Sequence, residues 1–233
     1  MTQLLAIGAT AAAVLALSAP APALAERPMA VDDAGTLAKG GAKLEFGVSR
    51  DAKLRGWDAA AGFAPVPELE LELGFAGLRD RASSPAARID GAGLAAKWVP
   101  LQSERGLSAG LKFELGRERT DDRAGGRETS TAQALTALAT WAFASGDLVH
   151  LNLGQAWAKS GGVRERLGTW GVGLDHPLGD ALSLTFELFG VEHSGADKQI
   201  GLRWTVAHGL KLSVGLGRGN GRSFGSAGVA WEF

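Results

Sequence analysis

Short stretches in which large apolar residues alternate with polar residues or glycine recur along most of the chain. Among them are ELELELGF (68–75), GLKFELG (110–116), DLVHLNLG (147–154), LSLTFELFG (182–190) and LKLSVGLG (210–217). Successive side chains of a β-strand point to opposite faces, so this alternation is typical of strands with one apolar face. The sequence therefore predicts an all-β protein.

Further alternating stretches lie between these phrases and complete a series of about twelve strands, paired as hairpins. The stretch 130–143 also has a composition compatible with a helix, but its threonines and flanking turn residues favour a strand. Short turns alternate with longer, charged connections, which is the plan of a transmembrane antiparallel up-and-down β-barrel with short periplasmic turns. The remaining strands are expected at 42–50, 54–64, 88–99, 130–143, 166–175, 198–206 and 223–233.

The beginning of the chain differs from the rest. It contains the uncharged apolar run LLAIGATAAAVLALSA, followed by the small-residue site APALA. These features predict a secretory signal peptide over 1–25, cleaved after Ala25. We expect a second region at 26–41, which is either a periplasmic lead into the first strand or a partial plug of the lumen. The barrel itself is expected over 42–233.

Composition excludes several classes of protein. The chain of 233 residues has no cysteine, which excludes disulfides, thiol catalysis and zinc–thiolate sites. A formal net charge of −1 argues against a nucleic-acid partner. No phosphate loop or metal-ligand spacing is present, so no cofactor is expected. After residue 25 no uncharged apolar stretch approaches the roughly 20 residues of a spanning helix. The prediction is therefore an exported protein of the bacterial outer membrane.

The strands have one apolar and one polar face. About twelve strands enclose more space than these leucines and valines fill, so we expect the apolar face against lipid and the polar face around a hydrated lumen. The expected lumen residues are Lys43, Glu45, Asp58, Glu70, Glu72, Lys97, Lys112, Glu114, His150, Asn152, Asp175, Glu187, Gln199, Arg203, Lys211 and Glu232. Their acidic excess predicts mild cation preference if the lumen is open.

Aromatic residues gather near the ends of alternate strands, next to the short turns. Such a ring is typical of a membrane–water interface. The expected interface residues are Phe63, Trp98, Trp141, Phe143, Trp204, Trp231 and Phe233. The chain ends in SAGVAWEF, where Gly228, Trp231 and Phe233 resemble the C-terminal signal that the barrel assembly machinery of Gram-negative bacteria recognises. A terminal strand is an exposed edge until the barrel closes, so an assembly factor can pair with it.

The connections at the other end are basic. Their arginines are expected to pair with phosphates of lipopolysaccharide and other outer-membrane lipids. These residues are Arg79, Arg81, Arg117, Arg119, Arg123, Arg127, Arg164, Arg166, Arg218 and Arg222.

His193 and Ser194 are the candidates for a lipid hydrolase, because some outer-membrane barrels carry histidine and serine together on one strand face. Neighbouring residues of a strand point to opposite faces, so this pair does not form a nucleophile and base while the segment stays regular. His150 and Asn152 share a face but have no nucleophile beside them. We therefore expect no enzymatic activity.

The stretch RPMAVDDAGTLAKGGAKLEFG (27–47) resembles the start of a family of outer-membrane barrels first associated with the meta-cleavage pathway of phenol degradation. The matching residues are Arg27, Pro28, Asp32, Asp33, Gly35, Thr36 and Gly40. The resemblance implies a porin or transporter for small solutes, hydrophobic or aromatic compounds among them, without catalytic residues. Two alternatives stay open: a structural or surface-interaction barrel with a closed lumen, and a lipid-modifying enzyme.

Overall fold

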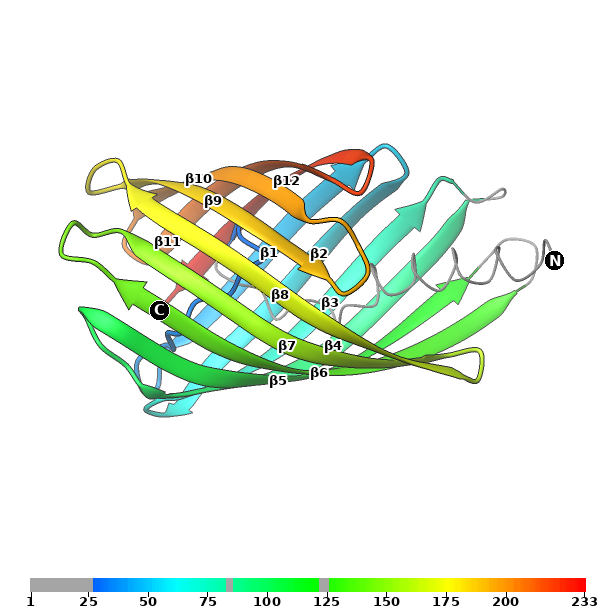
Figure 1. Ribbon diagram of the computed structural model, residues 1–233, viewed down its shortest axis with the longest axis horizontal. Helices are drawn as coiled ribbons and strands as arrows, with labels where there is room; N and C mark the ends of the chain where they lie inside the picture. Colours follow the sequence, from blue (N-terminus) through cyan, green and yellow to red (C-terminus); the bar gives the residue numbers. More distant parts are fainter. Residues whose placement is uncertain (1–26, 83–85, 122–125) are drawn as a thin grey trace.

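The computed structural model describes residues 27–82, 86–121 and 126–233, and the predicted signal peptide lies outside them. They form a closed antiparallel barrel in which β1 also pairs with β12, which confirms the predicted fold class (Figure 1). No described helix is long and apolar enough to cross a membrane. The strands are β1 (Ala42–Asp51), β2 (Leu54–Val66), β3 (Leu69–Asp80), β4 (Ala87–Leu101), β5 (Gly106–Asp121), β6 (Arg127–Ala142), β7 (Leu148–Ser160), β8 (Val163–Pro177), β9 (Leu182–Val191), β10 (Asp197–Ala207), β11 (Leu210–Gly219) and β12 (Arg222–Glu232).

Side chains alternate between the outer and the inner face of the wall. In β3, Leu71 and Leu73 are exposed, whereas Glu70 and Glu72 are buried. The same alternation holds in β6, the stretch that had a composition compatible with a helix. The outer face is therefore apolar over a broad belt, and the inner face is polar.

The strands run further than expected at the end of the barrel away from the C-terminus. β5 continues to Asp121 and β6 begins at Arg127, while β7 and β8 are joined by Gly161 and Gly162 alone. Both glycines have positive φ angles, 55° and 83°, as a two-residue hairpin turn requires. Polar segments such as 158–166, expected as long charged connections, are therefore largely paired strand. The outer face of an antiparallel sheet beyond the lipid contacts water, so strands can pair there without apolar side chains on that face.

The C-terminus and the start of β1 lie at the same end, which we call the terminal end. The backbone N–H of Phe233 donates to the carbonyl of Ala42 at 2.9 Å. The turns β2–β3, β4–β5, β6–β7, β8–β9 and β10–β11 lie at this end, and the opposite end is called the far end (Figure 1).

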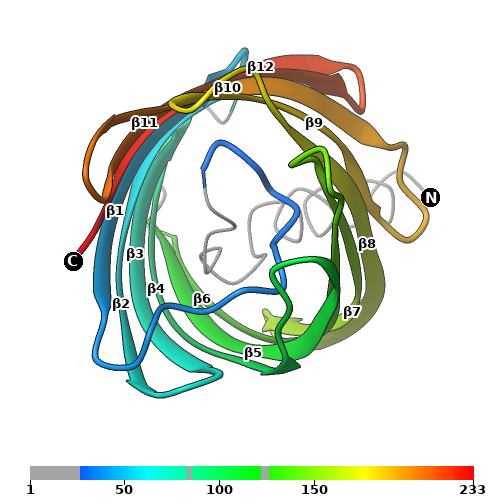
Figure 2. The same ribbon diagram turned by 90° about the vertical axis from the view of Figure 1, so that its left-hand side faces the viewer.

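The N-terminal segment, residues 27–41, runs inside the barrel before β1 begins (Figure 2). Two clusters of buried hydrophobic residues occur in the described chain, and both join this segment to the wall. One contains Met29 and Val31 packed against Phe189, and the other contains Ala34, Val99 and Leu138. The wall thus positions the segment, and the segment supplies much of the apolar packing inside the barrel.

Candidate functional site

The inner wall divides into two parts around the N-terminal segment. The charged half is the inner face of β1–β5, with Lys43, Glu45, Asp58, Glu70, Glu72, Lys97, Lys112 and Glu114. The polar half is the inner face of β6–β12, with Thr140, His150, Asn152, Asp175, Glu187, Gln199 and Arg203.

Ion pairs link neighbouring strands of the charged half. The ammonium of Lys43 lies 2.8 Å from Glu70, 2.9 Å from Glu72 and 3.3 Å from Glu45. All four side chains are buried, and buried charges persist only when they are paired. Lys43 therefore offsets the negative charge of the three carboxylates that surround it.

The segment supplies the carboxylate that the other lysines of this half require. Asp32 Oδ2 lies 2.6 Å from Lys112 Nζ, and Asp32 Oδ1 lies 3.1 Å from Lys97 Nζ. Asp33 is a weaker partner, 3.5 Å from Lys97. Burial alone would raise the pKa of Asp32, but the Lys112 and Lys97 ammonium groups outweigh it and hold the pKa well below its ordinary value. Asp32 is therefore ionised at neutral pH in a buried triad with the two lysines.

The polar half binds the backbone of the segment. Glu187 accepts the backbone N–H groups of Ala30 at 2.8 Å and Val31 at 2.9 Å. Asn152 accepts the N–H of Asp32 at 2.7 Å and donates to its carbonyl at 2.8 Å. These contacts satisfy consecutive peptide groups of an extended chain that makes no sheet of its own, as buried backbone groups require.

Thr140 of β6 continues this binding and connects it to His150. Its hydroxyl accepts the backbone N–H of Ala34 at 2.7 Å and lies 2.9 Å from Nδ1 of His150. Because the hydroxyl accepts from Ala34, its own proton remains free to be donated to the imidazole. His150 is thereby held on the wall, close to the segment.

The first described residues of the segment are bound by β10. Arg203 donates from Nε to the carbonyl of Arg27 at 2.8 Å, and Gln199 donates to the carbonyl of Pro28 at 2.5 Å. Arg203 also forms an ion pair with Asp175 at 2.5 Å, and this ion pair fixes the guanidinium that binds the carbonyl of Arg27.

The side chain of Arg27 lies over the seam between the first and last strands. Gly47 of β1 and Gly228 of β12 face each other in register, and a Cβ on either would overlap the Arg27 side chain. Arg27 also forms an ion pair with Asp58 of β2. Gly228, predicted as part of an assembly signal, thus also makes room for the segment.

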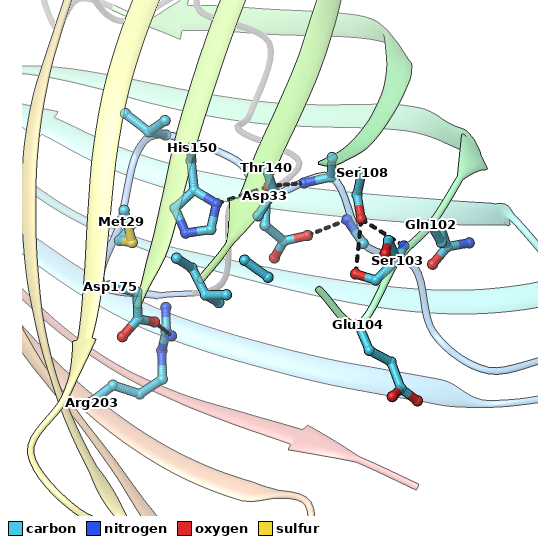
Figure 3. Close-up of a pocket in the computed structure, with 15 residues that line it drawn as sticks. Met29, Asp33, Gln102, Ser103, Glu104, Ser108, Thr140, His150, Asp175 and Arg203 are labelled. Atoms are coloured by element: carbon cyan, nitrogen blue, oxygen red, sulfur yellow. Dashed lines mark hydrogen bonds and ion pairs between the residues drawn. The ribbon is translucent and has the colours of Figure 1, made fainter. Parts of the chain in front are cut away.

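A cavity of about 470 Å³ lies between the segment and the terminal end (Figure 3). We call it the vestibule. Met29 and Asp33 of the segment border it, Gln102 of the β4–β5 turn lies at its edge, and His150 and Arg203 line its wall. On the other side of Asp32, among the lysines, only about 10 Å³ remains, hardly the space of one water molecule. The segment therefore separates a vestibule from a filled zone.

Some predicted residues lie away from the segment. Lys211 pairs with Glu232 at 3.1 Å near the terminal end, and Glu114 lies 3.6 Å from Lys112 on the wall. His193, in the exposed β9–β10 connection, lies 3.5 Å from Glu192. The described residues include no group of three or more histidine, aspartate or glutamate side chains arranged to hold a metal ion.

The predicted interface aromatics are exposed on the outer face toward the terminal end. Trp141 lies 6.4 Å from Phe143, and Trp231 lies 4.8 Å from Phe233, between ring centroids. All seven predicted interface residues are exposed: Phe63, Trp98, Trp141, Phe143, Trp204, Trp231 and Phe233.

Sequence reasoning missed Thr140. Its inward position follows from the alternation of β6, in which Leu138 and Thr140 are buried and Trp141 is exposed. No sequence pattern indicated that the Thr140 hydroxyl accepts a hydrogen bond from the backbone N–H of Ala34.

The family model described as Uncharacterised conserved protein UCP029691 matches residues 13–224. No curated protein sequence matches the chain.

Solved structures with a similar fold are outer-membrane barrels. The COG4313 outer membrane channel from Pseudomonas putida F1 has a TM-score of 0.62 at 11% identity, covering 86% of this chain and 98% of the channel. The KdgM porin has a TM-score of 0.58 at 12% identity, with 82% and 99% covered. The translocator domain of the autotransporter NalP from Neisseria meningitidis has a TM-score of 0.56 at 13% identity, with 84% and 89% covered. At these identities the likeness concerns the fold.

Proposed function

The chain belongs to the UCP029691 family of conserved proteins, and we propose that it is a passive outer-membrane channel for small solutes. In its resting state residues 27–38 close the lumen. The observation that carries the proposal is the buried triad of Asp32 with Lys97 and Lys112.

Stability alone does not explain such a triad. Well-packed apolar residues often stabilise an interior as well as a buried ion pair does, because desolvation of the charges offsets their attraction. A charged wall has a different advantage: it stays compatible with water when its partner leaves. Lys97 and Lys112 would be hydrated in an open lumen, whereas an apolar wall would collapse or bind other apolar groups. The lining therefore suits a lumen that is at times filled with water.

The outer surface supports a location in the outer membrane. A belt of exposed leucine, valine and aromatic residues surrounds the barrel, and the similar folds are outer-membrane barrels. With a signal peptide over 1–25, export would leave both termini on the periplasmic side. The vestibule then opens toward the periplasm.

The polar part of the vestibule's lining suits polar solutes, although Met29, Val31 and Leu148 make much of the lining apolar. It presents both charges, from Asp175 and Arg203, beside the polar side chains of His150 and Gln102. The resemblance to the phenol meta-pathway family points instead to hydrophobic or aromatic compounds. A flux assay with small sugars, amino acids and phenol as the solutes distinguishes the two classes.

A disulfide between the segment and the wall tests the proposal. The described residues contain no cysteine, and Ala34 packs against Leu138, so Ala34→Cys with Leu138→Cys is a clean engineered pair. We expect the oxidised double variant to lose solute flux into liposomes and the reduced form to regain it. The single variant Ala34→Cys is the control. Flux that is identical in the oxidised and reduced forms would contradict gating by the segment.

A structural barrel with a permanently closed lumen is the second candidate. The space that remains around Asp32, about 10 Å³, is too small for a passage, which favours this candidate. This reading predicts that the unmodified protein passes neither ions nor solutes at any voltage, even where a variant lacking the segment conducts.

The terminal strand is proposed to be recognised by the barrel assembly machinery. Trp231→Ala with Phe233→Ala should lower the amount of folded, heat-modifiable barrel in the outer membrane. Trp98→Ala with Trp204→Ala removes the same kind of exposed side chain away from the C-terminus and serves as the control. Equal losses in the two double variants would mean that only the interface aromatics matter.

A further inference from the structure

Arginines form a row on the outer face, near the far end. Arg50 faces Arg55 across β1 and β2, Arg55 faces Arg79 across β2 and β3, and Arg79 faces Arg88 across β3 and β4. All are exposed. We call Arg50, Arg55, Arg79 and Arg88 the arginine row. Like charges directly opposite each other destabilise a sheet, so this arrangement costs free energy unless an anion offsets it.

The protein itself offsets this repulsion at one end of the row only. Arg88 pairs with Asp90 at 2.9 Å. Arg50, Arg55 and Arg79 form no ion pair with a described residue. Farther along the wall, Asp121 receives both Arg119 at 3.1 Å and Arg127 at 2.9 Å, so these two outward arginines are compensated. β1, β2 and β3 therefore each carry an outward arginine without an ion pair in the described part of the chain, at neighbouring positions of the register.

The row borders directly on the apolar belt. The outward residue next to Arg50 is Val48, the one next to Arg55 is Trp57, and these two face each other in register. Trp57 stacks on Phe46, with the ring centroids 6.5 Å apart. A molecule that covers both surfaces needs an anionic head at the level of the arginines and an apolar body along the belt.

We infer that Arg50, Arg55 and Arg79 bind the phosphate head group of a phosphorylated lipid of the outer leaflet, with its acyl chains on the belt below. Guanidinium groups bind phosphate with two parallel hydrogen bonds, and adjacent strands place successive arginines about 5 Å apart. A head group with more than one phosphate can therefore bridge the row. The site rests on the proposed location in the outer membrane, but it is independent of channel activity.

The test compares purified protein in uncharged detergent micelles with the same micelles containing lipid A, which carries phosphate groups. The variant is Arg55→Gln with Arg79→Gln. Arg105→Gln is the control, because Arg105 is an exposed arginine in the β4–β5 turn at the opposite end. The measurements are the urea midpoint of unfolding, followed by tryptophan fluorescence, and the affinity for lipid A.

In lipid-free micelles we expect the double variant to be at least as stable as the unmodified protein, because the repulsion is relieved. With lipid A the order should reverse, and each arginine removed should weaken lipid A binding about fivefold. Dephosphorylated lipid A should produce no reversal. A variant that is equally destabilised in both kinds of micelle would overturn the inference, because the arginines would then be structural.

Two further arms identify the source of the anion. Inorganic phosphate that stabilises the unmodified protein as much as lipid A does would indicate a site for free anions and overturn the lipid assignment. A polyglutamate peptide with the stronger effect would point to an acidic protein partner and overturn it as well. Failure in these assays leaves the channel proposal standing, since none of them measures conduction.

Discussion

The charged half of the inner wall holds the N-terminal segment mainly by its charged side chains, although Glu70 also accepts the backbone N–H of Leu37 at 3.0 Å. The polar half holds the segment mainly by its backbone. On β4 and β5, two lysines converge on the carboxylate of Asp32. On β7 and β9, Asn152 and Glu187 bind peptide groups that any residue would offer. Binding by the polar half therefore depends mainly on the path of the segment, and binding by the charged half depends on the identity of its charged residues, Asp32 and Arg27 above all.

Removal of residues 27–38 should have the largest effect, because it eliminates both kinds of binding at once. We expect sustained conductance in planar bilayers where the unmodified protein gives rare openings. The emptied wall carries more acidic than basic residues, so the open pore should prefer cations, and reversal potentials in a KCl gradient measure this. Unchanged conductance would contradict closure of the lumen by residues 27–38. Clear anion preference would contradict the assignment of the acidic side chains to the lumen.

Asp32→Asn should have the next largest effect. It removes the buried carboxylate that Lys97 and Lys112 share and leaves them the longer contacts to Asp33 at 3.5 Å and Glu114 at 3.6 Å, and breaking such a buried pair typically costs about 3–5 kcal/mol. Open probability in single-channel records should rise steeply. Asp33→Asn is the matched control, since Asp33 is partly exposed and lies 3.5 Å from Lys97. Equal open probabilities of the Asp32→Asn and Asp33→Asn variants would contradict a specific role of the triad in closing the lumen.

Glu187→Gln probes the polar half and should act more weakly. The amide oxygen still accepts from the segment, so the loss is that of the charge on one acceptor, roughly 1–2 kcal/mol. We expect a modest rise in open probability, clearly below that of Asp32→Asn. Glu232→Gln removes a carboxylate near the terminal end and should change nothing. An effect of Glu187→Gln larger than that of Asp32→Asn would reverse the ranking of the two halves.

Acidification should act through the charged half and only at low pH. Because the pKa of Asp32 is lowered in the folded state, its contribution is fully present above the unfolded value of about 4 and is lost as pH falls through the depressed folded value. Conductance should therefore stay low between about pH 5 and pH 7 and rise only below about pH 4. Opening near pH 6 would mean that a group other than Asp32 holds the segment in place.

The sequence predicted the barrel and its strands well, whereas it gave no path for the N-terminal segment, for a physical reason. Alternation along a strand determines which side chains share a face, so Glu70, Lys97 and Glu187 were assigned to the lumen from their positions alone. The path of residues 27–38 follows no period, because it is set by acceptors on strands more than a hundred residues away, such as Asn152 and Glu187. The motif residues Asp32 and Asp33 were noticeable, but their partners were not.

The ends of the strands were also hard to predict. The alternation of large apolar residues stops where the belt stops, whereas backbone pairing continues to Asp121 and from Arg127. Hydrogen bonding between polar strands leaves little trace in hydrophobicity. The arginine row was hidden in part for the same reason, because Arg79 was expected in a connection and had no register, whereas Arg50, Arg55 and Arg88 lay at the ends of predicted strands.

The position of Arg27 across Gly47 and Gly228 implies an order of events during folding. Those glycines belong to the first and last strands, and they face each other only after the chain has closed upon itself. The resting place of Arg27 does not exist before that moment, so this one contact of the segment forms only after the seam. Arg27 in this position therefore reports that the first and last strands have paired.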